Sequence, residues 1–465
     1  MNQSSFSSLK LNPDLLNNLS SLGYTVMTPI QEQSIPPILA GKDVIGQGKT
    51  GSGKTAAFGL GLLQKLNVKD FRVQGLVICP TRELADQVAK NIRKLARSIH
   101  NIKVITLCGG TPLRPQADSI ENGCHIIVGT PGRIEDHLTK RTLNLNTVKT
   151  LILDEADRML DMGFQSVLDF IIEQIPKHRQ TLLFSATYPE EIQSITKRIM
   201  INPVMTKVES IHDNTSIRQH FYRVEDDAHR LRALCVLLKH FEPESALVFC
   251  KTKIETQEIA SELADFGFSA LALHGDLGQR DRDETLGRFS NKSVSVLVAT
   301  DVAARGLDID ALSAVINYRI AHDAEMHVHR IGRTGRAGSK GVAYTLFSER
   351  ESQKLTFLNN NIDPNKMSKP LPSIKLIDKP IQKPTKVTLQ IAGGKKQKLR
   401  PGDIVGALTG DKIIGGKQVG NIQIFDHWAL VAVDREVAQV ALKTLTDGRL
   451  KGRNFRVRLL SDEMS

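Results

Sequence analysis

The octapeptide GKTGSGKT at residues 48–55 has the spacing of a phosphate-binding loop, G-x-x-x-x-G-K-[ST]. A strand-like run, DVI, precedes it, and a helical pattern follows it. Glycines let backbone N–H groups face phosphate oxygens, and the N-terminus of the following helix adds positive potential. We expect Lys54 to reach the β- and γ-phosphates and the Thr55 hydroxyl to hold Mg²⁺. The predicted nucleotide-binding residues of this loop are Gly51, Ser52, Gly53, Lys54 and Thr55.

Two adjacent carboxylates in LILDEAD (151–157) could complete a hydrolytic site. Asp154 and Glu155 follow an apolar strand pattern, and the carboxyl ends of parallel strands converge on the ligand crevice. We expect Asp154 to hold Mg²⁺ through water, and Glu155 to orient and deprotonate the attacking water. A solvated acidic turn is the alternative, but it does not explain carboxylates that end a buried strand downstream of a phosphate loop. The pair predicts nucleotide hydrolysis.

Alternating strand and helix patterns must position these residues. Short β-branched runs such as GLVICP (75–80) and TLLFSAT (181–187) are separated by helix-length segments, and the alternation begins again after residue 215. This pattern predicts two tandem α/β domains with parallel sheets. Prolines and lysines then interrupt every periodicity at residues 361–384, which we expect to be a basic linker. The remaining residues suffice for a small α+β domain.

The composition favours an anionic partner. In 465 residues, Lys and Arg outnumber Asp and Glu by 62 to 50, and the formal net charge is +12. Nucleic acid is the leading candidate. The 5 cysteines are scattered without a C-x-x-C pair, which argues against a zinc site or a disulfide framework. We found no run of about 20 apolar residues and no signal-peptide pattern, so we expect a cytoplasmic protein without membrane association.

Further motifs make nearly the whole chain resemble the DEAD-box RNA helicases. They occur in the order and approximate spacing of that family: PTRELADQ (80–87), TPGR (130–133), DEAD (154–157), SAT (185–187), ATDVAARGLD (299–308) and HRIGRTGR (329–336). The resemblance implies two tandem RecA-like domains, ATP as the fuel and RNA as the substrate. The expected domains are a helicase ATP-binding domain with an N-terminal adenine-reading element (1–210), a helicase C-terminal domain (211–360), the linker (361–384) and an RNA-recognition-like domain (385–465).

The resemblance also implies how the nucleotide is held. GYTVMTPIQ (23–31) matches the adenine-reading element of the family, so Gln31 is expected to hydrogen-bond the adenine edge and Phe6 to stack on it. Asp308 matches a ribose contact. Arg333 and Arg336 match arginine fingers, which contribute about 10³ to 10⁵ in rate in other nucleotide hydrolases. The implied catalytic residues are therefore Lys54, Glu155, Arg333 and Arg336.

RNA contacts and coupling residues follow from the same motifs. Most contacts would reach phosphate and ribose, so the core should distinguish RNA from DNA through the 2′-hydroxyl and read little sequence. Ser185, Thr187 and His329 match residues that couple ATP use to strand separation. The implied RNA contacts are Thr81, Arg82, Gly109, Gly110, Thr130 and Arg133 in the first domain, and His274, Gly275, Gln279, Arg282, Thr300 and Asp301 in the second.

The C-terminal segment has the pattern of a βαββαβ RNA-recognition fold. Its aromatic positions are degenerate, because DHWALVAVD (426–434) offers His427 and Trp428 but lacks the consensus for base stacking on the sheet. We therefore expect basic loops to carry more of the binding, although a basic surface can also be an ordinary soluble edge. The predicted RNA-binding residues here are Lys395, Lys396, Lys398, Arg400, Lys451 and Arg453.

Two C-terminal stretches, GGKKQKLRPGDIVGALTGD and GRLKGRNFRVRLL, closely resemble the C-terminal domain of a bacterial DEAD-box subgroup. That resemblance implies anchoring to a hairpin of 23S ribosomal RNA and a role in assembly of the large (50S) ribosomal subunit, on pre-50S particles. We expect a monomeric, ATP-dependent RNA helicase. A non-catalytic ATP-gated RNA clamp and a DNA-translocating motor are the alternatives. Intact Glu155, Arg333 and Arg336 argue against the clamp.

Overall fold

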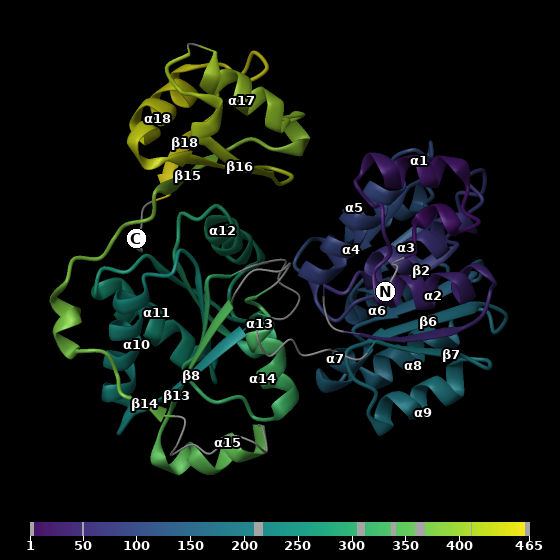
Figure 1. Ribbon diagram of the computed structural model, residues 1–465. Coiled ribbons are helices and arrows are strands. Elements are labelled where there is room, and N and C mark those ends of the chain that lie inside the picture. The colour runs from purple at the N-terminus through teal and green to yellow at the C-terminus, as the bar shows by residue number, and fades with distance from the viewer. Residues whose placement is uncertain are drawn as a thin grey trace. The chain divides into compact units, whose positions relative to one another are not determined.

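The computed structural model describes residues 4–48, 51–208, 217–304, 312–335, 341–358, 368–410 and 412–460. The chain divides into two compact units whose main boundary follows Ile211. Each unit contains a seven-stranded sheet, and the second unit also contains a four-stranded sheet (Figure 1).

The sheet of the first unit is parallel throughout, as the alternating pattern predicts. Its strands lie in the order β3 (Val104–Leu107), β4 (Ile126–Gly129), β2 (Gly75–Ile78), β5 (Thr150–Asp154), β6 (Gln180–Ser185), β1 (Val44–Gln47) and β7 (Val204–Lys207). The helices of this unit are α1 (Pro13–Ser21), α2 (Pro29–Leu39), α3 (Lys54–Gln64), α4 (Arg82–Leu95), α5 (Leu113–Glu121), α6 (Pro131–Thr139), α7 (Ala156–Asp161), α8 (Gln165–Glu173) and α9 (Glu190–Ile199).

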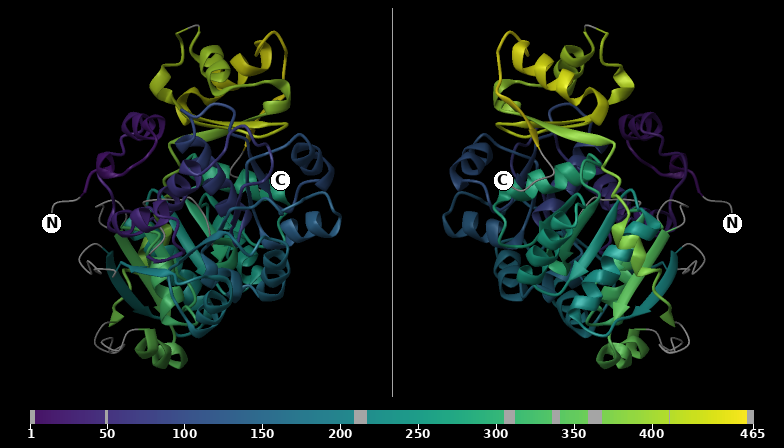
Figure 2. Two further views of the ribbon diagram at one scale, coloured as in Figure 1. Left: turned by 90° about the vertical axis from the view of Figure 1, so that its right-hand side faces the viewer. Right: turned by 90° about the vertical axis from the view of Figure 1, so that its left-hand side faces the viewer.

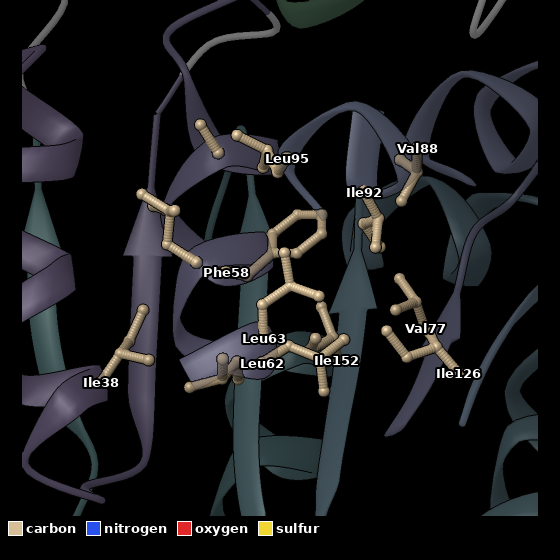
Figure 3. Close-up of a cluster of buried hydrophobic side chains, with 14 of the residues drawn as sticks. Ile38, Phe58, Leu62, Leu63, Val77, Val88, Ile92, Leu95, Ile126 and Ile152 are labelled. Atoms are coloured by element: carbon tan, nitrogen blue, oxygen red, sulfur yellow. The ribbon is translucent and has the colours of Figure 1, made fainter. Parts of the chain in front are cut away.

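Helices α3 and α4 pack their apolar sides on this sheet. Phe58 and Leu62 of α3 and Ile92 of α4 meet Val77 and Ile152 of the central strands (Figure 3). Burial of each such side chain contributes about 1.5–3 kcal/mol. Because α3 begins at Lys54 and α4 at Arg82, this packing also fixes the ends of the loops that precede the two helices.

The second unit contains the other parallel sheet. Its strand order is β10 (Ala270–Leu273), β11 (Val296–Thr300), β9 (Ala246–Cys250), β12 (Ala314–Asn317), β13 (Gly341–Phe347), β8 (Ile217–Arg223) and β14 (Ser368–Lys369). Its helices are α10 (Asp227–Phe241), α11 (Lys253–Asp265), α12 (Gln279–Ser290), α13 (Asp301–Ala304), α14 (Ala324–Ile331) and α15 (Ser352–Leu358). The prediction of two RecA-like parallel sheets is confirmed.

The C-terminal segment confirms the βαββαβ prediction. It runs through β15 (Lys386–Ile391), α17 (Pro401–Thr409), β16 (Val419–Ile424), β17 (Ala429–Asp434), α18 (Ala438–Asp447) and β18 (Val457–Leu460). The antiparallel strands lie in the order β16, β17, β15, β18. Helices α17 and α18 cover one face of this sheet, which we call the inner face (Figures 1 and 2).

The proline- and lysine-rich stretch 361–384 contains more structure than we expected. Its strand β14 pairs with β8, and a 3-10 helix, η3 (Ile374–Asp378), follows. Lys239 of α10 donates hydrogen bonds from Nζ to the carbonyl oxygens of Ile377 and Lys379, the latter at 2.8 Å. Such contacts between a lysine and backbone carbonyls of a distant segment leave no periodic signal in the sequence.

The outer face of the four-stranded sheet, opposite α17 and α18, packs against α12. Ser290 accepts hydrogen bonds from Asn421 (3.3 Å) and Gln423 (3.1 Å), and Gln390 donates one to Glu284 (3.0 Å). Gly287 permits the close approach, because a Cβ there would lie 2.3 Å from Cδ1 of Leu430. Most of the face on which RNA-recognition folds usually stack bases is therefore covered by α12.

Candidate nucleotide and RNA sites

The phosphate loop ends where α3 begins. Gly53 has φ +96°, a left-handed conformation that favours glycine, and Lys54 opens the helix. The Lys54 ammonium is buried and donates a 2.8 Å hydrogen bond to the carbonyl oxygen of Gly48 at the other end of the loop. Lys49 and Thr50 lie outside the described residues. Lys54 thus already faces the interior of the loop, where a phosphate could replace the Gly48 carbonyl as its acceptor.

Gln31 holds the phosphate loop against the N-terminal segment. Its Nε2 donates to the carbonyl oxygen of Gly53 at 3.1 Å, and its Oε1 accepts from the backbone N–H of Thr28 at 2.9 Å. The Thr28 hydroxyl donates to the carbonyl oxygen of Ser52 at 2.7 Å. A Cβ on Gly53 would lie 2.5 Å from Gln31 Nε2, so this contact requires glycine. Both ends of the Gln31 amide are engaged with the protein.

Phe6 lies in the core of the first unit. Its side chain is 2% exposed, and its ring meets that of Tyr24 edge-on with centroids 6.0 Å apart. Stacking of this ring on adenine stays a prediction, and so does the ribose contact of Asp308, which lies outside the described residues.

Asp154 ends β5 with a buried carboxylate. Burial raises its pKa to about 7, although the charge of Lys54 opposes this and that of Glu155 reinforces it. Among the described residues, its Oδ1 has no hydrogen-bond partner. An ionised carboxylate in this position needs a cation, and Mg²⁺ prefers oxygen ligands. The residues present therefore fit the predicted metal.

Glu155 adopts a left-handed backbone conformation with φ 52° and ψ 52° immediately before α7. For a residue other than glycine this costs about 1–3 kcal/mol, and such strain concentrates at functional sites. The buried carboxylate forms an ion pair with Arg158, whose Nη1 lies 2.9 Å from Oε2. The side chain is thereby held at the end of the sheet rather than left in solvent.

The sequence interpretation omitted Asp157 from the site, although it ends the DEAD motif. Its Oδ2 accepts hydrogen bonds from the backbone N–H groups of Ala186 (3.1 Å) and Thr187 (3.0 Å) and from the Thr187 hydroxyl (3.0 Å). Burial alone would raise the pKa of Asp157, but the Thr187 N–H, the Lys54 charge and Ser185 together lower it. An ionised Asp157 thus joins the ends of β5 and β6.

The structure brings the predicted RNA contacts of the first unit together at three strand ends. The Thr81 hydroxyl caps α4 by accepting from the N–H of Leu84 at 3.3 Å. Arg82 then lies over Gly109, where a Cβ would be 2.9 Å from its Nη2. Arg133, which follows Thr130 at the start of α6, donates to the carbonyl oxygen of Thr111, next to Gly110, at 3.0 Å.

The predicted RNA contacts of the second unit are partly engaged with one another and with the fold. Thr300 caps α13 by accepting from the N–H of Ala303, and the Arg282 guanidinium donates to the carbonyl oxygen of Ala303 at 2.9 Å. Asp301 forms a bidentate pair with Arg330 at 2.6 and 2.7 Å. Its carboxylate therefore binds α14 rather than pointing at solvent, and sequence reasoning did not identify Arg330.

Other predicted residues of the second unit are placed as follows. His274 Nε2 lies 3.3 Å from Gln257 Oε1, and the Gln279 amide donates to Asp283 at 2.8 Å. Gly275, after β10, is exposed, and His329 lies on α14. Arg333 follows α14 and is 4% exposed. Arg336 lies outside the described residues.

Comparisons with known proteins cover nearly all of the chain. Residues 28–195 match the DEAD/DEAH box helicase profile, residues 229–338 the helicase conserved C-terminal domain and residues 388–459 the DbpA RNA binding domain. The chain is 50% identical over 459 residues to the ATP-dependent RNA helicase DbpA of Escherichia coli K12, covering 98% of this chain and 99% of that protein. The chain belongs to the DEAD-box RNA helicases.

Other relatives of this DEAD-box helicase match its core. The DEAD-box ATP-dependent RNA helicase CshA of Bacillus cereus is 45% identical over 350 residues, 75% of this chain and 66% of that protein. S. cerevisiae Dbp5 bound to RNA and ADP BeF3 has a TM-score of 0.71 and 29% identity, covering 81% of this chain and 100% of that one. Mss116p bound to ssRNA and AMP-PNP has a TM-score of 0.71 and 28% identity, covering 80% and 81%.

This DEAD-box helicase is a DbpA-like, ATP-dependent RNA helicase with a C-terminal RNA-binding domain. In the part of the chain that the structure describes, none of the helices has the length and apolar character needed to cross a membrane.

Proposed function

We propose that the first unit hydrolyses ATP with Mg²⁺ held by Asp154, through water, and by the Thr55 hydroxyl. The buried Asp154 carboxylate, with Oδ1 unpartnered among the described residues, is the observation that carries this proposal. When bound, Mg²⁺ would neutralise charge on the phosphates. Lys54 exchanges its bond to the Gly48 carbonyl for a phosphate oxygen. Gly51, Ser52 and Gly53 present backbone N–H groups to the remaining phosphate oxygens.

Glu155 accepts the proton of the attacking water in this proposal. Its ion pair with Arg158 at 2.9 Å and the left-handed backbone hold the carboxylate at the strand end. A general base in this position contributes about 10²- to 10⁴-fold to the rate. The roles of Phe6 and Gln31 at adenine, of Asp308 at the ribose, and of Arg333 and Arg336 as arginine fingers stay predictions.

RNA binds the strand-end loops of both units by its phosphates and riboses. Support comes from Arg82 and Arg133, which place two guanidinium groups beside the partly buried Gly109 and the exposed Gly110. Relatives such as Dbp5 have been solved with RNA bound together with a nucleotide analogue. Asp157 transmits the state of the nucleotide site through Ser185 and Thr187, because it contacts that segment directly. His329 would serve the same coupling in the second unit.

The C-terminal domain anchors the enzyme to a 23S ribosomal RNA hairpin during assembly of the 50S subunit, on pre-50S particles. The match to the DbpA RNA binding domain over residues 388–459 supports this. Because α12 covers most of the outer sheet face, the basic loops are the remaining surface for the RNA backbone. Their exposed cations are Lys395, Lys396, Lys398, Arg400, Lys451 and Arg453. Cytoplasmic location and a monomeric state stay predictions.

The targeting proposal is tested by ATP hydrolysis with three stimulators at one salt concentration: a 23S hairpin fragment, an unrelated RNA and DNA. We expect the hairpin fragment to stimulate most strongly and DNA not at all. Fixed salt is essential, because phosphate contacts depend steeply on ionic strength. Equal stimulation by both RNAs would contradict the anchoring role, whereas stimulation by DNA would contradict RNA discrimination by the core.

The hydrolytic proposal is tested by Glu155→Gln. We expect ATP binding to persist while turnover falls about 10²- to 10⁴-fold, because the amide cannot accept the proton of water. Glu173→Gln, at the exposed end of α8, is the matched control and should hydrolyse ATP normally. Unchanged hydrolysis in Glu155→Gln would remove Glu155 as the base.

A further inference from the structure

Two aromatic rings stack on one another in the turn between β16 and β17. The rings of Phe425 and Trp428 are nearly parallel, with an interplanar angle of 9° and centroids 3.9 Å apart. Both side chains are partly exposed, and His427 between them is exposed. A large apolar pair of this kind at the end of a hairpin contributes little to a core, so its exposure needs an explanation.

The pair continues the outer face of the sheet beyond the part that α12 covers. Asn421 and Gln423 face α12 through Ser290, and Leu430 faces Gly287. Side chains two residues apart on a strand share a face, so Phe425 and Trp428 follow Gln423 and precede Leu430 on that same face. They lie at an end of this face where both rings stay partly exposed.

Cationic groups surround this pair. The exposed Arg280 guanidinium of α12 lies over the Trp428 ring at 6.0 Å, the outer limit of a cation–π contact. On another side, the backbone N–H of Lys395 donates to the carbonyl oxygen of Phe425 at 2.8 Å. The backbone N–H of Lys396 donates to the backbone carbonyl oxygen of Asp426 at 2.9 Å. The backbone of both lysines is thereby held against the aromatic turn.

A glycine makes this junction possible. A Cβ on Gly394 would lie 2.2 Å from the carbonyl oxygen of Phe425 and 2.7 Å from the backbone nitrogen of Trp428. The basic turn and the aromatic turn are therefore in direct backbone contact and form one surface. Asp426, the acid of that surface, lies 3.9 Å from the ammonium of Lys395.

We infer that Phe425, Trp428 and Arg280 form a stacking subsite for one unpaired nucleobase of the RNA. The base stacks on the indole, the exposed Arg280 side chain moves outward to cover the other side of the base, and Lys395 and Lys396 meet the flanking phosphates. Unpaired bases stack on aromatic rings and guanidinium planes, whereas bases inside a duplex offer no such face. Because α12 covers the part of the sheet face next to this pair, we expect one base rather than two or three to stack here.

The position of Arg280 connects this subsite to the RNA path of the second unit. It lies between Gln279 and Arg282 on α12, and both are proposed RNA contacts. The N-terminal end of α12 therefore carries both proposed RNA contacts of the second unit and the cation that lies over the Trp428 ring. The inference rests on the proposed RNA binding of the second unit and adds a second, base-stacking anchor to it.

The chain contains 1 tryptophan, so the intrinsic tryptophan fluorescence of the protein comes from Trp428 alone. Full-length protein is titrated with a fluorescein-labelled, unstructured oligoribonucleotide while anisotropy reports binding and indole emission reports stacking. We expect saturable quenching of Trp428 that follows the anisotropy. The same sequence annealed into a blunt duplex should bind without this quenching.

Substitutions separate stacking from folding. Trp428→Ala should weaken single-strand binding about 5- to 150-fold, the range for loss of one base–aromatic stack. Trp428→Phe keeps an aromatic ring and should restore most of the affinity for the single strand. If Trp428 only filled space in the fold, an aromatic ring would not be needed for this recovery. His427→Ala, in the same exposed turn, is the matched control and should bind normally.

The outcomes are distinguishable. Normal anisotropy with unquenched Trp428 and full affinity in Trp428→Ala would overturn the stacking subsite and leave the proposed RNA binding intact. Absence of any anisotropy change would refute the proposed function itself. Quenching together with a weakened Trp428→Ala and a rescued Trp428→Phe supports the subsite.

Discussion

A 3.0 Å hydrogen bond between Gln116 Oε1 and Arg133 Nη1 ties α5 to the start of α6. The Gln116 amide donates to the carbonyl oxygen of Cys108 and to the Thr111 hydroxyl, so its Oε1 is left to accept. His137 Nε2 lies 3.1 Å from the same oxygen and therefore carries the proton. Burial and then the charge of Arg133 lower the pKa of His137, which keeps the ring neutral. Gln116 thus joins two segments that carry proposed RNA contacts.

Gln116→Ala should therefore loosen both RNA loops without touching the nucleotide site. Loss of hydrogen bonds worth about 0.5–1.5 kcal/mol each predicts an RNA KM for ATPase stimulation raised about tenfold, with kcat at saturating RNA retained. Steady-state ATP hydrolysis over an RNA titration measures both constants. Glu121→Ala, at the exposed end of α5, is the control. A fall in kcat with unchanged KM would contradict a positioning role.

Thr187→Val tests the connection between Asp157 and the SAT segment. The substitution keeps the shape of the side chain but removes its 3.0 Å hydrogen bond to the Asp157 carboxylate. Bonds to charged groups contribute about 1.5–3 kcal/mol, so we expect duplex separation to slow at least about tenfold while ATP hydrolysis falls less. Unwinding and ATPase assays run in parallel give the number of ATP molecules hydrolysed per strand separated.

The control for this substitution is Thr206, a buried threonine of β7 in the same unit. Thr206 donates from its hydroxyl to the carbonyl oxygen of Ile45 at 3.1 Å, away from the DEAD segment. Thr206→Val should lower stability without changing the number of ATP molecules used per strand separated. An equal loss of unwinding and hydrolysis in Thr187→Val would argue against coupling.

Local patterns made most of the fold and the nucleotide site predictable. A glycine loop before Lys54 and the carboxylates after an apolar strand are short-range signals with a direct physical meaning. The strands β7, β8 and β14 were not predicted. Two lie at sheet edges, where exposed polar side chains weaken the apolar signal, as the exposed Lys207 and Lys369 show.

Contacts between remote segments could not be predicted. Gln116 lies 17 positions from Arg133 and has no motif of its own. Alternating polar residues such as Thr388 and Gln390 are typical of a solvated strand face, yet both are buried because α12 packs on them. A single sequence does not indicate which surface covers such a face.

Gly287→Leu should separate the C-terminal domain from α12. A Cβ at this position would lie 2.3 Å from Leu430 Cδ1 and 2.9 Å from Gln423 Oε1, and overpacking costs about 1–3 kcal/mol. Time-resolved fluorescence anisotropy of Trp428 should then show faster local tumbling of that domain. Gly406→Leu on α17, where no atom lies within 4 Å of the added Cβ, is the control. Unchanged tumbling in Gly287→Leu would contradict the contact.

Acid should loosen the second unit through Glu351. Its carboxylate accepts a 2.5 Å hydrogen bond from the buried Arg230 and a 2.9 Å bond from the N–H of Ser348. Burial, the largest influence, raises the pKa of Glu351, but these bonds outweigh it and hold the pKa below its ordinary value of 4.5. The interaction therefore stabilises the fold above that pH and is lost as pH falls through the lowered pKa.

Glu351→Gln should remove this pH dependence and destabilise the neutral-pH protein by about 3 kcal/mol, because the buried Arg230 then keeps only the longer, 3.6 Å ion pair with the exposed Asp227. Hydrogen exchange of the β13 amides, measured from pH 7 downward, reports the effect locally. Glu349→Gln is the matched control, since Glu349 pairs with Arg223 at the surface, where ion pairs contribute about 0–1 kcal/mol. If the β13 amides exchange at the same rate in both variants, the buried pair of Arg230 and Glu351 does not stabilise this sheet.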